Sequence, residues 1–196
     1  MTGSVTLDLA LQGGGAHGAY TWGVLDRLLD ERHIHCSAIS GASAGAINAV
    51  VLADGLVAGG RAGAKRALEA FWQRISQSSR RFLPDKSPFH ALFLPGYVPS
   101  SPWSRLGPWG APLAIWSAIG DTVVRKFSPY EWNPLNFNPL LDLLAESVDF
   151  SRLRSTEDIQ LFVSATSVRS GGLRVFRNAE LSPQAVMASA CLPQLF

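Results

Sequence analysis

Two glycine-rich turns, each placed between a strand pattern and a helix pattern, constrain the fold of this chain more than any other feature of its sequence. The first, "QGGGAHG" (12–18), follows an alternating stretch of β-forming residues, "VTLDLALQ" (5–12), and precedes a run with helical apolar spacing. The second, "GASAG" (41–45), follows a short strand pattern over 35–40 and precedes a small-residue helix over 44–60 that closes with glycines. This order of elements predicts a βαβ unit with parallel strands and a right-handed crossover.

The rest of the chain continues the α/β pattern around one unusual segment. The stretch 82–139 holds ten of the twelve prolines and four of the six tryptophans, and it is poor in charge. Because disordered segments are poor in aromatic residues, this composition favours an ordered cap. The other expected elements are a helix over 61–76, a helix that begins at Asn138 and Pro139, a strand over 158–168, its hairpin partner over 173–178 and a helix capped by Ser182. With 196 residues, the chain is predicted to form a single α/β domain interrupted by the cap.

The first glycine-rich turn fits two different kinds of site. Gly13, Gly15 and Gly18 spell G-x-G-x-x-G, which is typical of dinucleotide binding. That function also needs an acidic residue at the end of the second strand, about 20 residues on, to bind a ribose hydroxyl. Asp30 and Glu31 come before that strand, so they cannot bind the ribose hydroxyl. The dinucleotide interpretation therefore lacks the acidic residue that it requires.

The residues that follow the second strand favour a nucleophilic serine instead. Gly41-Ala42-Ser43-Ala44-Gly45 is a G-x-S-x-G sequence, in which small neighbours allow a strained strand-to-helix turn to expose the serine. Such a turn also places Ser43 at a helix N-terminus, which favours developing negative charge. Since parallel strands end at the same edge of a sheet, the amides of Gly14, Gly15 and Ala16 would lie near Ser43 and could stabilise an oxyanion.

Three segments of the chain resemble the patatin-like phospholipase family. "GGGAHGAY" (13–20) resembles the family's G-G-G-x-[RK]-G oxyanion motif, "GASAG" resembles its nucleophile elbow, and "ASACLPQLF" (188–196) resembles a segment that comes shortly before its catalytic acid. The resemblance implies a three-layer α/β/α sandwich with a mostly parallel central sheet, and hydrolysis of lipid acyl esters by a Ser–Asp dyad without a histidine. The site residues that it implies are Ser43 as the nucleophile, Gly41 and Gly45 in the elbow, and Gly13, Gly14, Gly15 and Ala16 in the oxyanion loop.

The chain departs from the family pattern at two points. His17 stands where the family usually has Arg or Lys. Two interpretations of His17 are open. In the first, the imidazole is a polar group at the start of a helix that either bonds to the backbone or is exposed. In the second, it acts at the site, by orienting the oxyanion loop or by contacting a lipid headgroup. The family's D-G-[GA] acid motif does not occur in the sequence, so we expect that the chain is C-terminally incomplete and that the catalytic Asp lies beyond residue 196.

Other catalytic arrangements fit the sequence less well. A Ser-His-Asp triad in the order of the α/β-hydrolases would have to use His90, the only histidine after Ser43, and this leaves no room for the strands of that fold. Acyltransferases with a similar elbow generally place a histidine beside the serine, where this chain has Ala42 and Ala44. An acyltransferase and a non-catalytic lipid-binding remnant stay open as alternatives.

Composition limits the partners that we expect. Charged residues make up only 16% of the chain, against a usual ~25%, which indicates apolar surface for a lipid or ester substrate. A net charge of +2 without a basic run gives no support for nucleic-acid binding. The four histidines show no metal-ligand spacing, and we expect neither a metal nor a cofactor.

The N-terminus and the cysteines indicate a cytoplasmic location. The sequence begins without the basic and apolar regions of a signal peptide, and Cys36 and Cys191 are expected to be reduced thiols. Peripheral contact with a membrane through the cap is one interpretation, because Trp103, Trp109 and Trp116 are of the type found at lipid interfaces. The alternative is that these tryptophans simply pack on the sandwich. The sequence does not determine an oligomeric state.

Overall fold

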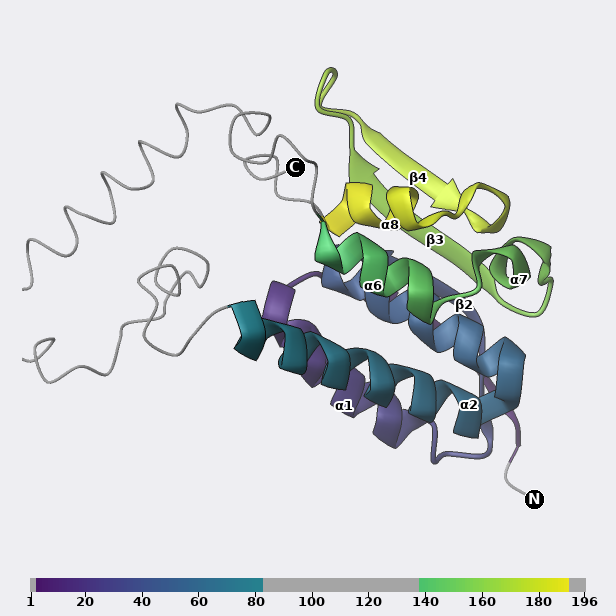
Figure 1. Cartoon of the computed structure of the whole chain (residues 1–196). Helices are drawn as coiled ribbons and strands as arrows, with labels where there is room; N and C mark the ends of the chain where they lie inside the picture. Colours follow the sequence, from purple (N-terminus) through teal and green to yellow (C-terminus); the bar gives the residue numbers. More distant parts are fainter. Residues whose placement is uncertain (1–2, 83–137, 191–196) are drawn as a thin grey trace, which may run out of the picture. The chain divides into compact units, whose positions relative to one another are not determined.

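A mixed, mostly parallel sheet forms the centre of the computed structural model, which describes residues 3–82 and 138–190. Its strands are β1 (Val5–Leu11), β2 (Ile34–Ala42), β3 (Gln160–Thr166) and β4 (Leu173–Arg177), in the order β1-β2-β3-β4 (Figure 1). The pairs β1–β2 and β2–β3 are parallel, and β4 forms an antiparallel hairpin with β3. The predicted parallel βαβ unit and the predicted hairpin are therefore confirmed.

One face of the sheet belongs to the hydrophobic core. The strand register places Leu9, Ile39 and Leu161 in one row across the sheet, and Ile39 and Leu161 are fully buried. The same core cluster contains side chains from α1 (Gly18–Leu28), α2 (Ala44–Phe82), α6 (Pro139–Ser147), α7 (Phe150–Ser155) and α8 (Pro183–Ala190). The architecture is that of the predicted α/β class and is consistent with a three-layer α/β/α sandwich. The residues that the structure describes form the sheet of this sandwich and the helices that pack on the core face of the sheet.

Helix α2 is two helical arms joined by a glycine turn. Gly59 and Gly60 leave helical geometry, and Gly60 has a φ of 58°, which an L-residue with a side chain rarely adopts. The chain then runs back along the first arm (Figure 1). A Cβ atom on Gly63 would lie 2.4 Å from the carbonyl oxygen of Gly55, so the two arms approach to backbone contact. The predicted helices over 44–60 and 61–76, closed by glycines, are confirmed.

The last three helices begin at polar caps. The Asn138 side chain accepts a hydrogen bond from Leu141 N at 3.1 Å, and the Ser182 hydroxyl accepts one from Ala185 N at 3.1 Å, both as expected. The six-residue helix α7 was not predicted, because so short a helix shows little apolar periodicity. Asp149 caps it by accepting hydrogen bonds from Ser151 N and Arg152 N.

Most of the cap prediction lies outside the described residues. This holds for 83–137, including Trp103, Trp109 and Trp116, and for the residues that follow Ala190. Residues 1–75 and 138–191 form one compact unit. Within the part of the chain that the structure describes, none of the helices combines the length and the apolar composition that crossing a membrane requires.

Candidate active site

Two loops meet at the carboxyl ends of β1 and β2. A Cβ atom on Gly13 would lie 2.8 Å from Ser43 Cβ and 3.6 Å from Ser43 Oγ. Real Cβ atoms do not approach this closely, so the backbone of the glycine loop lies directly against Ser43. The structure thus brings together the two motifs that the sequence analysis singled out.

The turn around Ser43 explains both glycines of the elbow. Ser43 has a φ of 53°, the only positive φ of a non-glycine residue in the described part of the chain. A Cβ atom on Gly45 would lie 2.1 Å from Leu11 O, and one on Gly41 would lie 2.7 Å from Ala46 N. Since both sites exclude any side chain, the spacing G-x-S-x-G follows from close backbone packing on either side of the serine.

Ser43 stands at the N-terminus of α2. Its carbonyl oxygen accepts hydrogen bonds from Ala46 N at 2.9 Å and Ile47 N at 3.2 Å, which begin the helix. The first turn of α2 holds no acidic residue. Unpaired N–H groups and the helix dipole therefore favour negative charge that develops near Ser43.

The glycine loop is exposed and is ordered by its own backbone. Gly15, with a φ of 56°, begins a short 3₁₀ turn, η1 (Gly15–His17), in which His17 N donates to Gly14 O at 3.1 Å. The exposed His17 imidazole also lies within hydrogen-bonding distance of this carbonyl, with Nδ1 at 3.1 Å. The contact requires a proton on Nδ1, because a carbonyl oxygen can only accept. His17 thus bonds to the backbone of the loop that it follows.

A buried asparagine fixes the helix after the glycine loop to α2. Asn48 is fully buried, and its amide donates to Gly18 O at 2.9 Å and accepts from Trp72 Nε1 at 2.9 Å. A Cβ atom on Gly18 would lie 2.8 Å from the Trp72 ring and 2.9 Å from Ala44 Cβ. The sequence analysis missed this arrangement, although a polar residue within the apolar run "AINAVVLA" was an available signal.

Helix α8 reaches the elbow from the far end of the chain. The backbone N–H of Ser43 donates to Ser189 Oγ at 2.7 Å, across a separation of 146 residues. Ser189 belongs to the third family-like segment, "ASACLPQLF", but the sequence analysis assigned it no role of its own.

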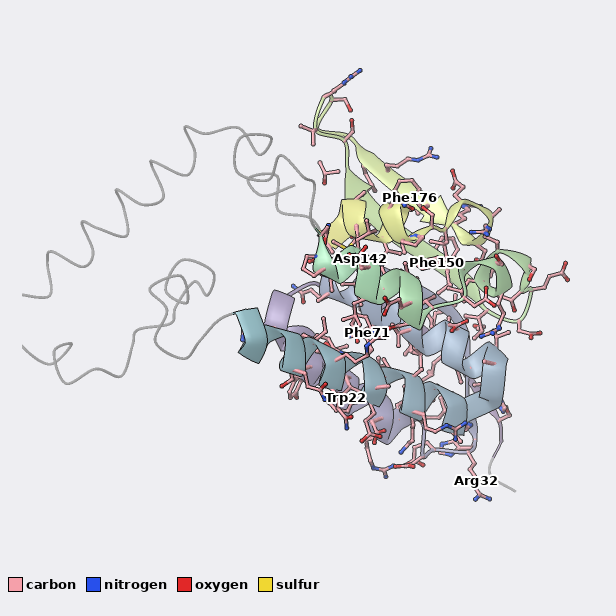
Figure 2. All side chains as sticks on the ribbon, viewed as in Figure 1. Trp22, Arg32, Phe71, Asp142, Phe150 and Phe176 are labelled. Carbon is pink, nitrogen blue, oxygen red and sulfur yellow. The ribbon has the colours of Figure 1, made fainter. Side chains whose placement is uncertain are left out.

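The described aspartates are engaged away from Ser43. Asp8 accepts a hydrogen bond from Ser37 Oγ at 2.6 Å, Asp54 pairs with Arg152 at 2.8 Å, and Asp142 (Figure 2) is exposed in the first turn of α6. Within residues 3–82 and 138–190, no carboxylate hydrogen-bonds to Ser43 Oγ. The general base that a serine nucleophile needs is therefore not among the contacts of the described residues.

Asp54 has an unusual environment but lies away from the elbow. Burial raises the pKa of its carboxyl group, and the nearby Arg152 guanidinium opposes this shift. Asp54 follows Ser43 by eleven residues along α2, which corresponds to ~16 Å of helix. We assign Asp54 to the ion pair that links α2 to α7.

No group of His, Cys, Asp and Glu side chains within the described ranges could hold a metal ion.

A cavity of about 290 Å³ lies at the opposite end of the strands from Ser43, with Ile34, Cys36 and Ile159 in its wall. Burial raises the pKa of the Cys36 thiol to about 11, and the negative charge of Asp8 adds to this shift.

Cys36 is therefore expected to react slowly with thiolate-specific reagents. Its pKa of about 11 against 9.0 for an unperturbed thiol lowers the thiolate fraction at pH 8 by roughly 100-fold. A thiolate of higher pKa is also more nucleophilic, by roughly tenfold for two pKa units. We therefore expect a Cys191→Ser variant, in which Cys36 is the only cysteine, to react with a disulfide reagent at least ~10-fold more slowly when folded than in urea. The folded rate should also keep rising with pH above 9, where the rate in urea levels off. Equal rates in the two states would contradict the prediction.

Comparisons with known proteins identify one family and two similar structures. Residues 9–196 match the family described as patatin-like phospholipase. Two solved structures are similar to the chain. The heterodimeric complex ExoU–SpcU from the type III secretion system of Pseudomonas aeruginosa aligns at 20% identity, with 97% of this chain and 37% of that chain covered and a TM-score of 0.41. The type III effector protein ExoU aligns at 19% identity, with coverages of 96% and 40% and a TM-score of 0.43.

The chain thus spans 37–40% of the length of these two structures. Among curated proteins, no sequence matches it. The family match covers nearly the whole chain, including the glycine loop and the elbow, and it confirms the resemblance found in the sequence. The chain belongs to the patatin-like phospholipase family.

Proposed function

We propose that this protein is a serine hydrolase that cleaves acyl esters of lipids, with Ser43 as the nucleophile. Membership of the patatin-like phospholipase family supports lipid hydrolase activity in general. The observation that carries the specific assignment is the positive φ of Ser43, combined with the approach of the Gly13 backbone to its side chain. Strained backbone at a partly exposed nucleophile, beside a loop of glycines, is the geometry that acyl transfer requires.

The proposed reaction proceeds in two steps. Ser43 Oγ attacks the ester carbonyl carbon while a carboxylate base, an Asp as in the family, takes the hydroxyl proton. The carbonyl oxygen becomes an oxyanion that the backbone amides of Gly14, Gly15 and Ala16 stabilise, each by ~2.7–4 kcal/mol. The proton then passes to the leaving alcohol, and water hydrolyses the acyl-enzyme. In this proposal His17 holds the loop through its contact with Gly14 O rather than acting on the substrate.

Labelling with a fluorophosphonate probe tests the nucleophile directly. We expect the complete protein to hydrolyse a phospholipid and to carry the probe on the peptide that contains Ser43, and we expect labelling to disappear in Ser43→Ala. Hydrolysis by protein that stays unlabelled at Ser43 would contradict the assignment. Lipid binding without turnover or labelling would favour a non-catalytic lipid-binding protein, and acyl transfer to a carrier thiol instead of water would favour an acyltransferase.

A further inference from the structure

Ser189 holds the backbone of the elbow from a second helix. The distance from Ser43 N to Ser189 Oγ is 2.7 Å, which is a short hydrogen bond for an N–H donor. The carbonyl oxygen of Ser43 accepts hydrogen bonds from Ala46 N and Ile47 N in the first turn of α2. Ser43 is thus held on both sides of its Cα atom, by α8 at its N–H group and by α2 at its carbonyl group.

This arrangement leaves the Ser43 hydroxyl without a hydrogen-bond partner among residues 3–82 and 138–190. A serine at a helix N-terminus usually caps the helix with its own side chain. Within the described residues, Ser43 Oγ makes no such hydrogen bond, and the Ser43 N–H donates to Ser189 Oγ. A left-handed backbone costs a residue with a side chain roughly 1–2 kcal/mol, so an external contact that favours this conformation raises its population.

Helix α8 is a rigid support for Ser189. Val186 and Met187 are buried in the core cluster and anchor the helix there. Because the core sets the position of α8, the hydroxyl of Ser189 is pre-organised to accept the hydrogen bond from Ser43.

We propose that Ser189 is a positioning residue, whose hydroxyl accepts the Ser43 N–H and so keeps the Ser43 side chain in its reactive position. The proposal rests on the proposed function of Ser43. Ser189 acts through the backbone of Ser43 and not on the substrate, so its loss should lower kcat and leave KM unchanged. A misplaced reacting group typically costs up to about 100-fold in rate.

The test compares Ser189→Ala with Ser182→Ala in the complete protein. Both variants remove a serine hydroxyl, but Ser182 lies just before α8, and among the described contacts its hydroxyl bonds only to Ala185 N. For Ser189→Ala we expect kcat and the rate of fluorophosphonate labelling to fall by roughly 10–100-fold, with KM within twofold of the parent value. Ser189→Thr, which keeps the acceptor oxygen, should restore most of this rate. Ser182→Ala should keep the parent kcat.

Hydrogen exchange at the Ser43 amide separates this proposal from the proposed function. The exchange rate of that amide should rise at least tenfold in Ser189→Ala and stay unchanged in Ser182→Ala, whether or not the protein hydrolyses esters. Unchanged exchange, or a kcat for Ser189→Ala that matches Ser182→Ala, would overturn the role of Ser189. A third outcome is that the parent protein shows no ester hydrolysis while Ser189→Ala still shows the predicted rise in exchange. This result would overturn the proposed function and retain the hydrogen bond from Ser43 N–H to Ser189 Oγ. If Ser189→Ala fails to fold, Ser189→Cys replaces it in the comparison, because a thiol is only a weak hydrogen-bond acceptor. An exchange rate and a kcat equal to those of the parent in Ser189→Cys would overturn the proposal.

Discussion

Replacement of Ser43 by alanine is expected to reduce kcat for phospholipid hydrolysis by roughly 10⁴-fold or more. The alanine side chain cannot form the acyl-enzyme, and only substrate binding and the oxyanion loop would still lower the barrier. The reaction should be followed by release of fatty acid from phospholipid in detergent micelles, with thermal unfolding as the check on folding. A variant with more than one tenth of the parent activity would exclude Ser43 as the nucleophile.

A Ser43→Gly variant provides the matched control, because it separates the chemistry from the backbone strain. It lacks the hydroxyl, so its activity should be as low as that of Ser43→Ala. Glycine adopts the φ of 53° found at this position without steric cost. The free energy of unfolding of Ser43→Gly should therefore exceed that of Ser43→Ala by about 1 kcal/mol. Equal stability of the two variants in urea denaturation would show that position 43 is not strained.

Replacement of Gly45 by alanine is the second change for which we expect a large effect. Its Cβ atom would lie 2.1 Å from Leu11 O and 2.8 Å from Gln12 O, so the start of α2 would have to move away from the end of β1. We expect a loss of about 3 kcal/mol or more in the free energy of unfolding, together with a loss of hydrolysis of at least ~100-fold, because the elbow and the glycine loop would separate.

The control for Gly45→Ala is the same substitution at Gly23. Gly23 lies in α1 and is exposed, and a Cβ atom on it would meet no other part of the protein within 4 Å. Alanine there should stabilise the protein by roughly 0.5–1 kcal/mol, because it lowers the entropy cost of ordering a helix residue. If the two variants have equal free energies of unfolding, the elbow does not pack closely on β1.

The local parts of this fold could be predicted because short stretches of sequence determine them. The alternation in β1, the cap at Asn138 and the glycines that end the first arm of α2 each act over a few residues. The meeting of the glycine loop and the elbow was also predictable, since parallel strands bring the turns that follow them to one edge of a sheet.

The contacts that fix the candidate site were not predictable in the same way. Asn48 joins α1 and the two arms of α2 through its hydrogen bonds to Gly18 and Trp72, and Ser189 joins α8 to the elbow through its hydrogen bond to Ser43. They depend on how the helices pack, which apolar periodicity does not specify. Helix α7 was missed for a different reason, because its six residues are too few to show apolar periodicity.

The hydrogen bond between Ser43 and Ser189 also sets an order of events during protein synthesis. The strands and turns that bring Gly13 against Ser43 are complete within the first 45 residues, whereas Ser189 is translated 146 residues after Ser43. At 5–20 residues per second, the ribosome takes roughly 7–30 s to cover that distance. A nascent chain therefore contains the glycine loop and the elbow well before α8 is synthesised. The proposed nucleophile can gain the hydrogen bond from its N–H to Ser189 only near the end of this stretch of translation.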